Sequence, residues 1–192
     1  MDWATILKEY PALVAAFSAL VLAVLGYLFN RLNSIHNKNL EIEKKEYDRR
    51  AAIYNKQIQE AREYVDTLFD LLYLQWQLIN ILMNSSSITN KGREMLLEES
   101  KQVSVLWGKA NKQVLSIKIL NDDELASLHT KIVENAFRDV DYIVTVTGGV
   151  LDGSYKSFDK ERLKRLADVF GDGKLMIADM KIRLDKLAIS IK

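Results

Sequence analysis

Residues 10–29 form a run of about twenty residues without a charged side chain, YPALVAAFSALVLAVLGYLF. At a rise of 1.5 Å per residue, a helix of this length matches a hydrocarbon core roughly 30 Å thick. Pro11 falls in the first turn of such a helix, where its missing N–H would have no partner within the helix anyway. The run predicts one transmembrane helix over residues 10–29, inside a membrane anchor formed by residues 1–30.

A cleaved signal peptide is the alternative interpretation of this run. The leader holds Asp2 and Glu9 beside Lys8, the apolar run is long for a signal peptide, and no A-x-A site follows it. We therefore expect the run to remain in the chain as an anchor in membrane lipid. Four residues near its ends are expected at the membrane interface: Trp3, Tyr10, Tyr27 and Arg31.

Positive charge is distributed unevenly about the run. The nine residues before residue 10 hold one lysine, whereas six lysines and arginines follow between residues 31 and 50. Positively charged flanks are retained in the cytoplasm. The asymmetry predicts a single-pass protein of the cell inner membrane, with the N-terminus outside and the C-terminal body in the cytoplasm.

Small residues recur at three- and four-residue spacing along the predicted span. They are Ala12, Ala15, Ala19, Ala23 and Gly26. Such a stripe allows another helix backbone to approach closely in lipid, although alanine as a filler that faces lipid is an equal alternative. We expect transmembrane packing along this stripe in a homo-oligomer.

A heptad pattern follows the span, and neither glycine nor proline occurs between residues 27 and 91. The apolar positions of the pattern include Tyr47, Tyr54, Ile58, Ala61, Val65 and Leu68. A narrow apolar stripe flanked by charges is typical of a helix that buries one side against a partner helix. Residues 31–84 are predicted to form a juxtamembrane rod with an oligomer seam. The alternative is a partner helix within the same chain.

Residues 85–192 are predicted to complete a helical bundle. Polar residues at 84–92 indicate a loop, and a helix is expected at about 93–119. The next helix begins at a cap, Asn121 or Asp122, and ends at Gly148 and Gly149. It includes the run IVTVTGG, whose β-branched residues suit a strand that has no second strand to pair with.

Two closing helices are expected at about 159–170 and 174–191, with a hinge turn at Gly171-Asp172-Gly173. A second span at 71–83 is the alternative for the end of the rod, but that run is short and contains Gln75 and Asn80. The expected fold class is all-α: a single N-terminal transmembrane helix that continues into a long helix, then a cytoplasmic antiparallel helical bundle of four to five helices.

Side chains that carry chemistry are sparse. The chain has no cysteine and two histidines, His36 and His129, which leaves little for thiol catalysis or a transition-metal site. Lysine and arginine total 27 against 26 aspartate and glutamate, so no net field attracts nucleic acid. We expect no enzyme, no catalytic, cofactor-binding or metal-binding residues, no cofactor, and no nucleic-acid partner.

The segment Arg31-Leu-Asn-Ser-Ile-His36 has the R-x4-6-H spacing of the HEPN ribonucleases, an all-helical family that the expected body resembles in class. The resemblance covers six residues. In that family the motif belongs to the bundle and usually lies at a dimer cleft, whereas here it follows the predicted span. We therefore assign neither residue a catalytic role, and we expect Arg31 to act as an interfacial anchor.

Two classes of function fit this architecture. In the first, a non-enzymatic protein self-assembles through its transmembrane and rod helices and acts as a docking, scaffold or sensory subunit for an unidentified protein partner. In the second, the oligomer is a pore that permeabilises its own membrane. Some bacterial antiphage accessory proteins resemble this architecture, without a shared motif. A HEPN-like ribonuclease is a more distant third hypothesis.

Overall fold

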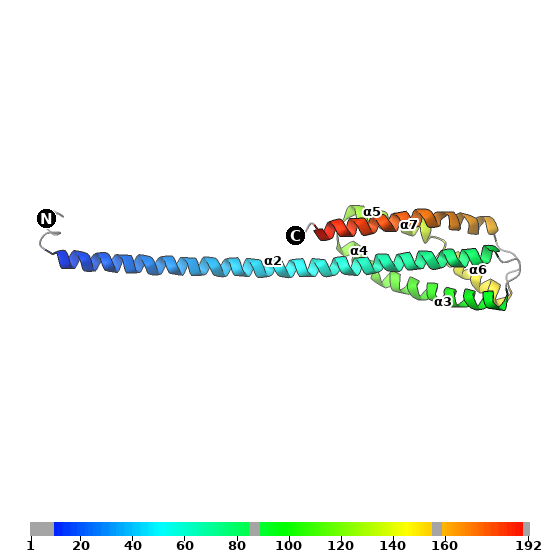
Figure 1. Ribbon diagram of the computed structural model, residues 1–192, viewed down its shortest axis with the longest axis horizontal. Coiled ribbons are helices and arrows are strands. Elements are labelled where there is room, and N and C mark those ends of the chain that lie inside the picture. Colours follow the sequence, from blue (N-terminus) through cyan, green and yellow to red (C-terminus); the bar gives the residue numbers. More distant parts are fainter. Residues whose placement is uncertain (1–9, 85–88, 155–158, 190–192) are drawn as a thin grey trace. The chain divides into compact units, whose positions relative to one another are not determined.

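The computed structural model describes residues 10–84, 89–154 and 159–189 of the 192-residue chain (Figure 1). Every regular element in these ranges is a helix, which confirms the predicted all-helical class. The helices are α2 (Pro11–Asn84), α3 (Asn90–Gln113), α4 (Leu115–Ile119), α5 (Asp123–Ala136), α6 (Val140–Asp152) and α7 (Lys160–Ile189). The chain divides into two compact units, Met1–Ala51 and Ala52–Lys192, and α2 contributes residues to both.

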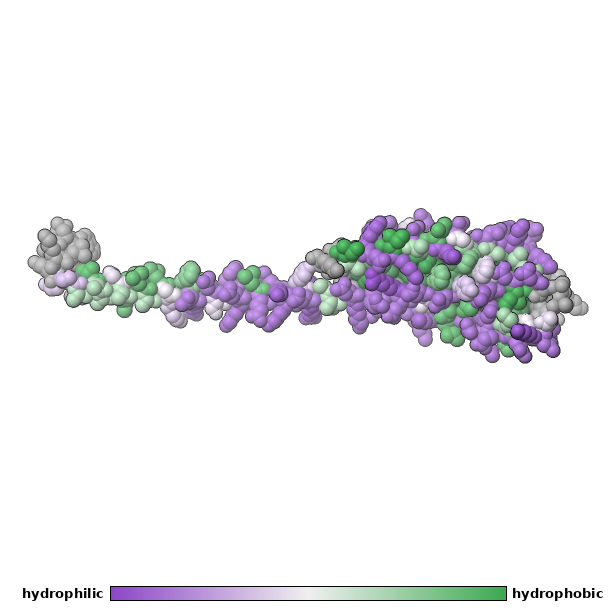
Figure 2. All heavy atoms as spheres, in the orientation of Figure 1, coloured by the Kyte–Doolittle hydropathy of each residue, from purple (hydrophilic) through white to green (hydrophobic). Residues whose placement is uncertain are grey.

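The described part of the first unit is the beginning of helix α2. Pro11 is its first helical residue, where the fixed φ of proline suits the helix and its missing N–H removes no bond. Helix α2 is long and apolar enough to cross a membrane, and its apolar stretch is not buried against other parts of the described chain. Figure 2 shows hydrophobic residues near the start of this helix and hydrophilic ones farther along it.

In the second unit, α2 becomes a core helix from Ile58 onward. Buried apolar residues from α2, α3, α4, α5, α6 and α7 form one contiguous hydrophobic core. Its fully buried large side chains include Ile58, Leu68, Leu78, Leu96, Ile132, Ile143, Leu163 and Ile177. Burial of each such side chain contributes on the order of 1.5 to 3 kcal/mol relative to exposure. Apolar residues whose spacing predicted these helices are therefore buried in the core.

Helices α2 and α7 contact each other in an antiparallel orientation. The Asp66 carboxylate lies 2.7 Å from the Lys181 ammonium, and the Trp76 ring stacks on Phe170 with ring centroids 5.1 Å apart. Increasing residue numbers in α2 thus meet decreasing numbers in α7. In Figure 1, the orange and red α7 lies beside the second-unit part of α2.

The predicted hinge at Gly171-Asp172-Gly173 is wrong, because α7 runs unbroken through these residues. Gly173 is buried, and a Cβ at this position would lie 2.9 Å from Cδ2 of Leu72 on α2. The missing side chain therefore allows close approach of α7 to α2 and does not end a helix.

The helix predicted to end at Gly148 and Gly149 is also different in the structure. Helix α5 ends at Ala136, and a separate helix α6 begins at Val140 and continues through both glycines to Asp152. Gly153 then ends α6 with a φ of 77°, in the left-handed region that glycine tolerates. The run IVTVTGG is helical, as expected.

The start of α3 follows the predicted loop. Thr89 is its N-cap and accepts a hydrogen bond from the Gly92 N–H at 3.2 Å, while residues 85–88 of the loop lie outside the described residues. The helix expected to continue to residue 119 is divided at Val114, where α3 gives way to the short α4. The helix thus begins near the expected place and has one additional break.

Candidate functional site

The small-residue stripe of the first unit is open. Ala12, Ala15, Ala19, Ala23 and Gly26 are all exposed. A Cβ added to Gly26 would meet nothing within 4 Å. The rest of the described chain leaves the stripe uncovered, so its packing against another transmembrane helix stays a prediction.

The expected interfacial residues are exposed where the structure describes them. Tyr10, Tyr27 and Arg31 lie on the surface of α2 or at its start, and Trp3 lies outside the described residues. Their rings and guanidinium group are therefore accessible to a membrane interface. Contact with lipid headgroups stays a prediction.

The predicted oligomer seam is divided between the surface and the core of the chain. Ile58, Ala61, Val65 and Leu68 are at most 1% exposed, Tyr54 packs against the core, and Tyr47 is 58% exposed. Helices of the same chain thus cover the four buried residues, which is the intramolecular arrangement that the sequence left open. A second copy could reach them only if this core opened.

A different apolar stripe of α2 remains uncovered in the first unit. Leu28, Leu32, Ile35 and Ile42 are 47%, 66%, 48% and 62% exposed, and Asn39 between them is also exposed. Successive spacings of four, three, four and three residues place all five on one side of the helix. We call these five residues the 28–42 stripe. It is the candidate interaction site of the first unit.

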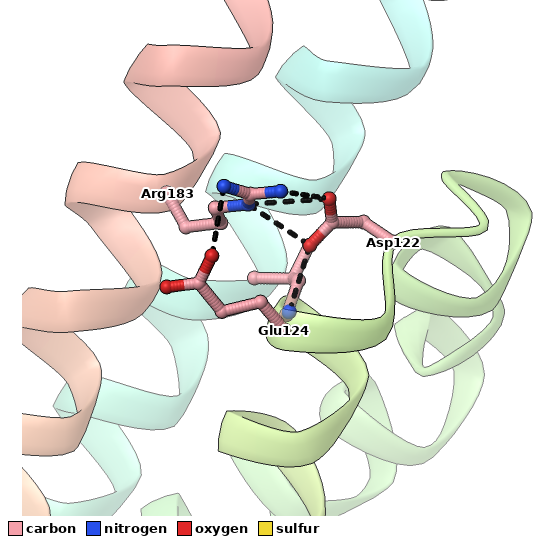
Figure 3. Close-up of polar contacts among 4 residues, drawn as sticks. Asp122, Glu124 and Arg183 are labelled. Carbon is pink, nitrogen blue, oxygen red and sulfur yellow. Dashed lines mark hydrogen bonds and ion pairs between the residues drawn. The ribbon is translucent and has the colours of Figure 1, made fainter.

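The second unit contains an ion-pair cluster between α5 and α7 (Figure 3). Nη2 of Arg183 lies 2.6 Å from Oδ2 of Asp122, and its Nη1 lies 2.7 Å from Oε2 of Glu124. Asp122 also accepts a hydrogen bond from the Leu125 N–H at 2.8 Å, which confirms that it caps α5. The hydrogen bonds from Arg183 hold the pKa of Asp122 below its usual value. The cluster joins α5 and α7, and both oxygens of the Asp122 carboxylate accept hydrogen bonds within the chain.

His129 is paired with Tyr64 beside the core. The Tyr64 hydroxyl lies 2.7 Å from Nε2 of His129, and burial raises the pKa of Tyr64 to about 12. Burial, together with the charge of Lys118, lowers the pKa of His129. Both shifts favour the neutral forms, so the two side chains form a neutral contact between α2 and α5. His36 and Arg31, by contrast, are both exposed on the first unit.

An open cavity of about 480 Å³ lies beside the turn between α5 and α6. Its charged lining residues are Glu134, Arg138, Asp139, Arg162, Arg165 and Asp172. The Arg162 guanidinium is ion-paired with Asp139, and its central carbon lies 3.8 Å from the centroid of the Tyr142 ring. The charged lining of the cavity is therefore balanced, with three positive and three negative groups.

Within the described ranges, the cavity included, no group of three or more histidine, aspartate or glutamate side chains is placed to hold a metal ion. The expectations of no enzyme, no cofactor and no nucleic-acid partner stay predictions. The two ion-pair clusters, Asp122 with Arg183 and Asp139 with Arg162, join residues far apart in the sequence. Neither pair could be predicted from the sequence, because no local motif links partners separated in this way.

The chain matches no protein-family model, no curated protein and no solved structure. Its class is therefore defined by its own structure: an all-helical protein whose N-terminal helix is long and apolar enough to span a membrane. The pore and the antiphage role stay predictions.

Proposed function

We propose that this chain is a non-enzymatic, single-pass membrane protein that self-assembles and acts as a docking, scaffold or sensory subunit at the inner membrane. Helix α2 starts as the transmembrane helix, and the second unit is a cytoplasmic antiparallel helical bundle. The observation that carries the proposal is the exposure of bulky apolar side chains near the start of α2, such as Phe17, Leu20 and Leu22. Contact with water would cost on the order of 1.5 to 3 kcal/mol for each, and lipid removes this cost.

The second unit supports the docking role. Its core is closed by the chain's own helices, and its polar clusters tie those helices together. Arg62 with Asp185 and Arg183 with Asp122 are examples, with contacts of 2.6 Å in each pair. A unit whose polar groups hold its own helices in place presents a fixed surface, which suits recognition of a partner protein.

Membrane insertion is tested by alkaline carbonate extraction of membranes that contain the full chain. The wild type is expected in the pellet, whereas Leu20→Arg combined with Leu22→Arg is expected to release the protein, because arginine is costly inside lipid. Leu97→Arg with Val105→Arg is the matched control, since these apolar residues are exposed on α3. Extraction of the wild type would overturn the anchoring.

Orientation is tested by a reporter fused after the last residue. The excess of lysine and arginine after the span predicts reporter activity in the cytoplasm only. Activity in the periplasm would contradict the proposed orientation while leaving insertion intact.

A further inference from the structure

We propose that the 28–42 stripe binds the same stripe of a second copy, forming a short parallel coiled coil with Asn39 opposite Asn39. This inference rests on the proposed self-assembly and names its surface and its partner. The surface belongs to the first unit alone, so the core of the second unit stays closed. It also differs from the seam that the sequence predicted, whose residues from Ile58 onward are buried in that core.

The spacing of the stripe is that of a coiled-coil seam. Leu32 and Asn39 occupy a positions of a heptad, and Leu28, Ile35 and Ile42 occupy d positions. All are exposed and none is covered by another described part of the chain. Over two heptads the stripe thus presents four apolar side chains and Asn39, and no described part of the chain covers them.

The stripe has a defined end. The next a and d positions hold Glu46 and Arg49, both exposed charged residues that would not be buried in an apolar seam. Toward the N-terminus the same positions continue into the predicted span as Leu25 and Val21. The seam therefore begins within the predicted membrane segment and ends near Ile42, well before α2 enters the core of the second unit.

Asn39 and the flanking charges define how two copies would align. A single asparagine at an a position specifies the register of a coiled coil at a cost in stability. Lys38 is at g, and Glu43 is at the following e, so a parallel pair in register places Lys38 of each copy beside Glu43 of the other. Among the described residues neither makes an ion pair, whereas Lys45 lies 2.7 Å from Glu41 in its own helix.

Insertion into one membrane supplies the parallel orientation. All copies with the same charge asymmetry enter the bilayer in the same direction, so their helices emerge side by side and point the same way. This geometry favours pairing of identical stripes in register. A free partner protein would have no such constraint on its orientation, so the second copy is the occupant that charge and insertion both favour.

The small-residue stripe cannot serve the same contact. Ala19 lies about 180° around the helix from Leu28, at about 100° per residue. A helix that meets a neighbour through the 28–42 stripe therefore turns Ala19 away from that neighbour. The two surfaces can be told apart by where cysteines crosslink.

Because the natural chain has no cysteine, single cysteines in the full chain give unambiguous crosslinks in native membranes. Ile35→Cys and Ile42→Cys are expected to form disulfide-linked dimers on mild oxidation. Asn37→Cys and Lys44→Cys, which lie on the opposite side of the same exposed helix, are the matched controls and are expected to crosslink several-fold less. Each variant is compared only after it is shown to resist carbonate extraction.

The ion pair gives a second readout. In the Ile35→Cys background, Lys38→Glu is expected to reduce the crosslinked fraction several-fold, because it places two carboxylates together. Adding Glu43→Lys restores the opposite charges and is expected to restore crosslinking. Failure of this rescue would overturn the parallel, in-register alignment.

The outcomes separate this inference from the proposed function. Equal crosslinking on both sides of the helix would overturn the 28–42 seam. Crosslinks from Ala19→Cys, with none from Ile35→Cys or Ile42→Cys, would overturn the seam and leave self-assembly in place. No crosslink at any position would overturn both.

Discussion

The Arg183 guanidinium donates hydrogen bonds to the carboxylate of Asp122, which lies 61 residues away in the sequence. Its Nε lies 3.0 Å from Oδ1 and 3.2 Å from Oδ2, and its Nη2 lies 2.6 Å from Oδ2. The same carboxylate caps α5 through the Leu125 N–H. The Asp122 side chain thus caps the N-terminus of α5 and also binds α7 through Arg183.

Two substitutions of Asp122 separate these roles. Asp122→Ala removes the cap and the ion pair, and loss of the cap alone costs about 0.5 to 2 kcal/mol. Asp122→Asn keeps a good capping residue and removes the charge, so we expect a smaller loss of unfolding free energy than with alanine. Glu124→Gln, at a mostly exposed carboxylate, is the control and is expected within about 0.5 kcal/mol of the wild type. Chemical unfolding of the full chain measures all three, and equal losses for alanine and asparagine would refute the capping role.

The contact between His129 and Tyr64 predicts a pH dependence of stability. Because the pKa of His129 is lowered in the folded protein, the unfolded chain, with a histidine pKa of about 6.5, binds this proton more readily. This contribution to stability is therefore fully present above pH 6.5 and is lost as the pH falls below it. Thermal unfolding between pH 7.5 and about pH 5 measures the effect.

His129→Gln is expected to flatten this dependence, since glutamine does not titrate and still offers the Tyr64 hydroxyl a polar partner. His36→Gln is the control, because His36 is exposed on the first unit. An unchanged decline in His129→Gln would show that other groups cause it.

The two glycines of the predicted hinge are expected to respond in opposite ways to alanine. Gly171 is exposed with nothing within 4 Å of an added Cβ, so Gly171→Ala should stabilise α7 by about 0.5 to 1 kcal/mol. At Gly173 the added Cβ meets Leu72 at 2.9 Å, and overpacking of a core costs about 1 to 3 kcal/mol. Gly173→Ala should therefore be destabilising overall. Stability curves of the two variants decide the matter, and stabilisation by both would contradict the close approach of α7 to α2.

The sequence predicted where helices form better than where they end. Gly148 lies inside α6, because its cost in a helix, roughly 1 kcal/mol, is offset by burial of neighbours such as Val146. The break before Val140 contains neither glycine nor proline. The spacing of Ile132, Ala136, Val140 and Ile143 continues across it, so periodicity alone could not reveal the turn.

The 28–42 stripe could not be identified from the sequence alone, for a similar reason. Apolar residues lie on more than one side of α2, and both Ile35 and Ile58 fit a heptad. Only packing shows that Ile58 is buried by the same chain while Ile35 stays exposed. The long apolar helix at the N-terminus, by contrast, could be predicted from the sequence, because a long run without charges needs no knowledge of the rest of the fold.

The most direct test of self-assembly is the protein mass of the detergent-solubilised particle, measured by light scattering with the detergent contribution subtracted. A self-assembled protein is expected to have a mass of at least twice the 22.0 kDa of one chain. Ile35→Asp with Ile42→Asp is expected to reduce the mass to that of one chain, whereas Asn37→Asp with Lys44→Asp should leave the assembly intact. A wild-type mass of 22.0 kDa would contradict the central claim.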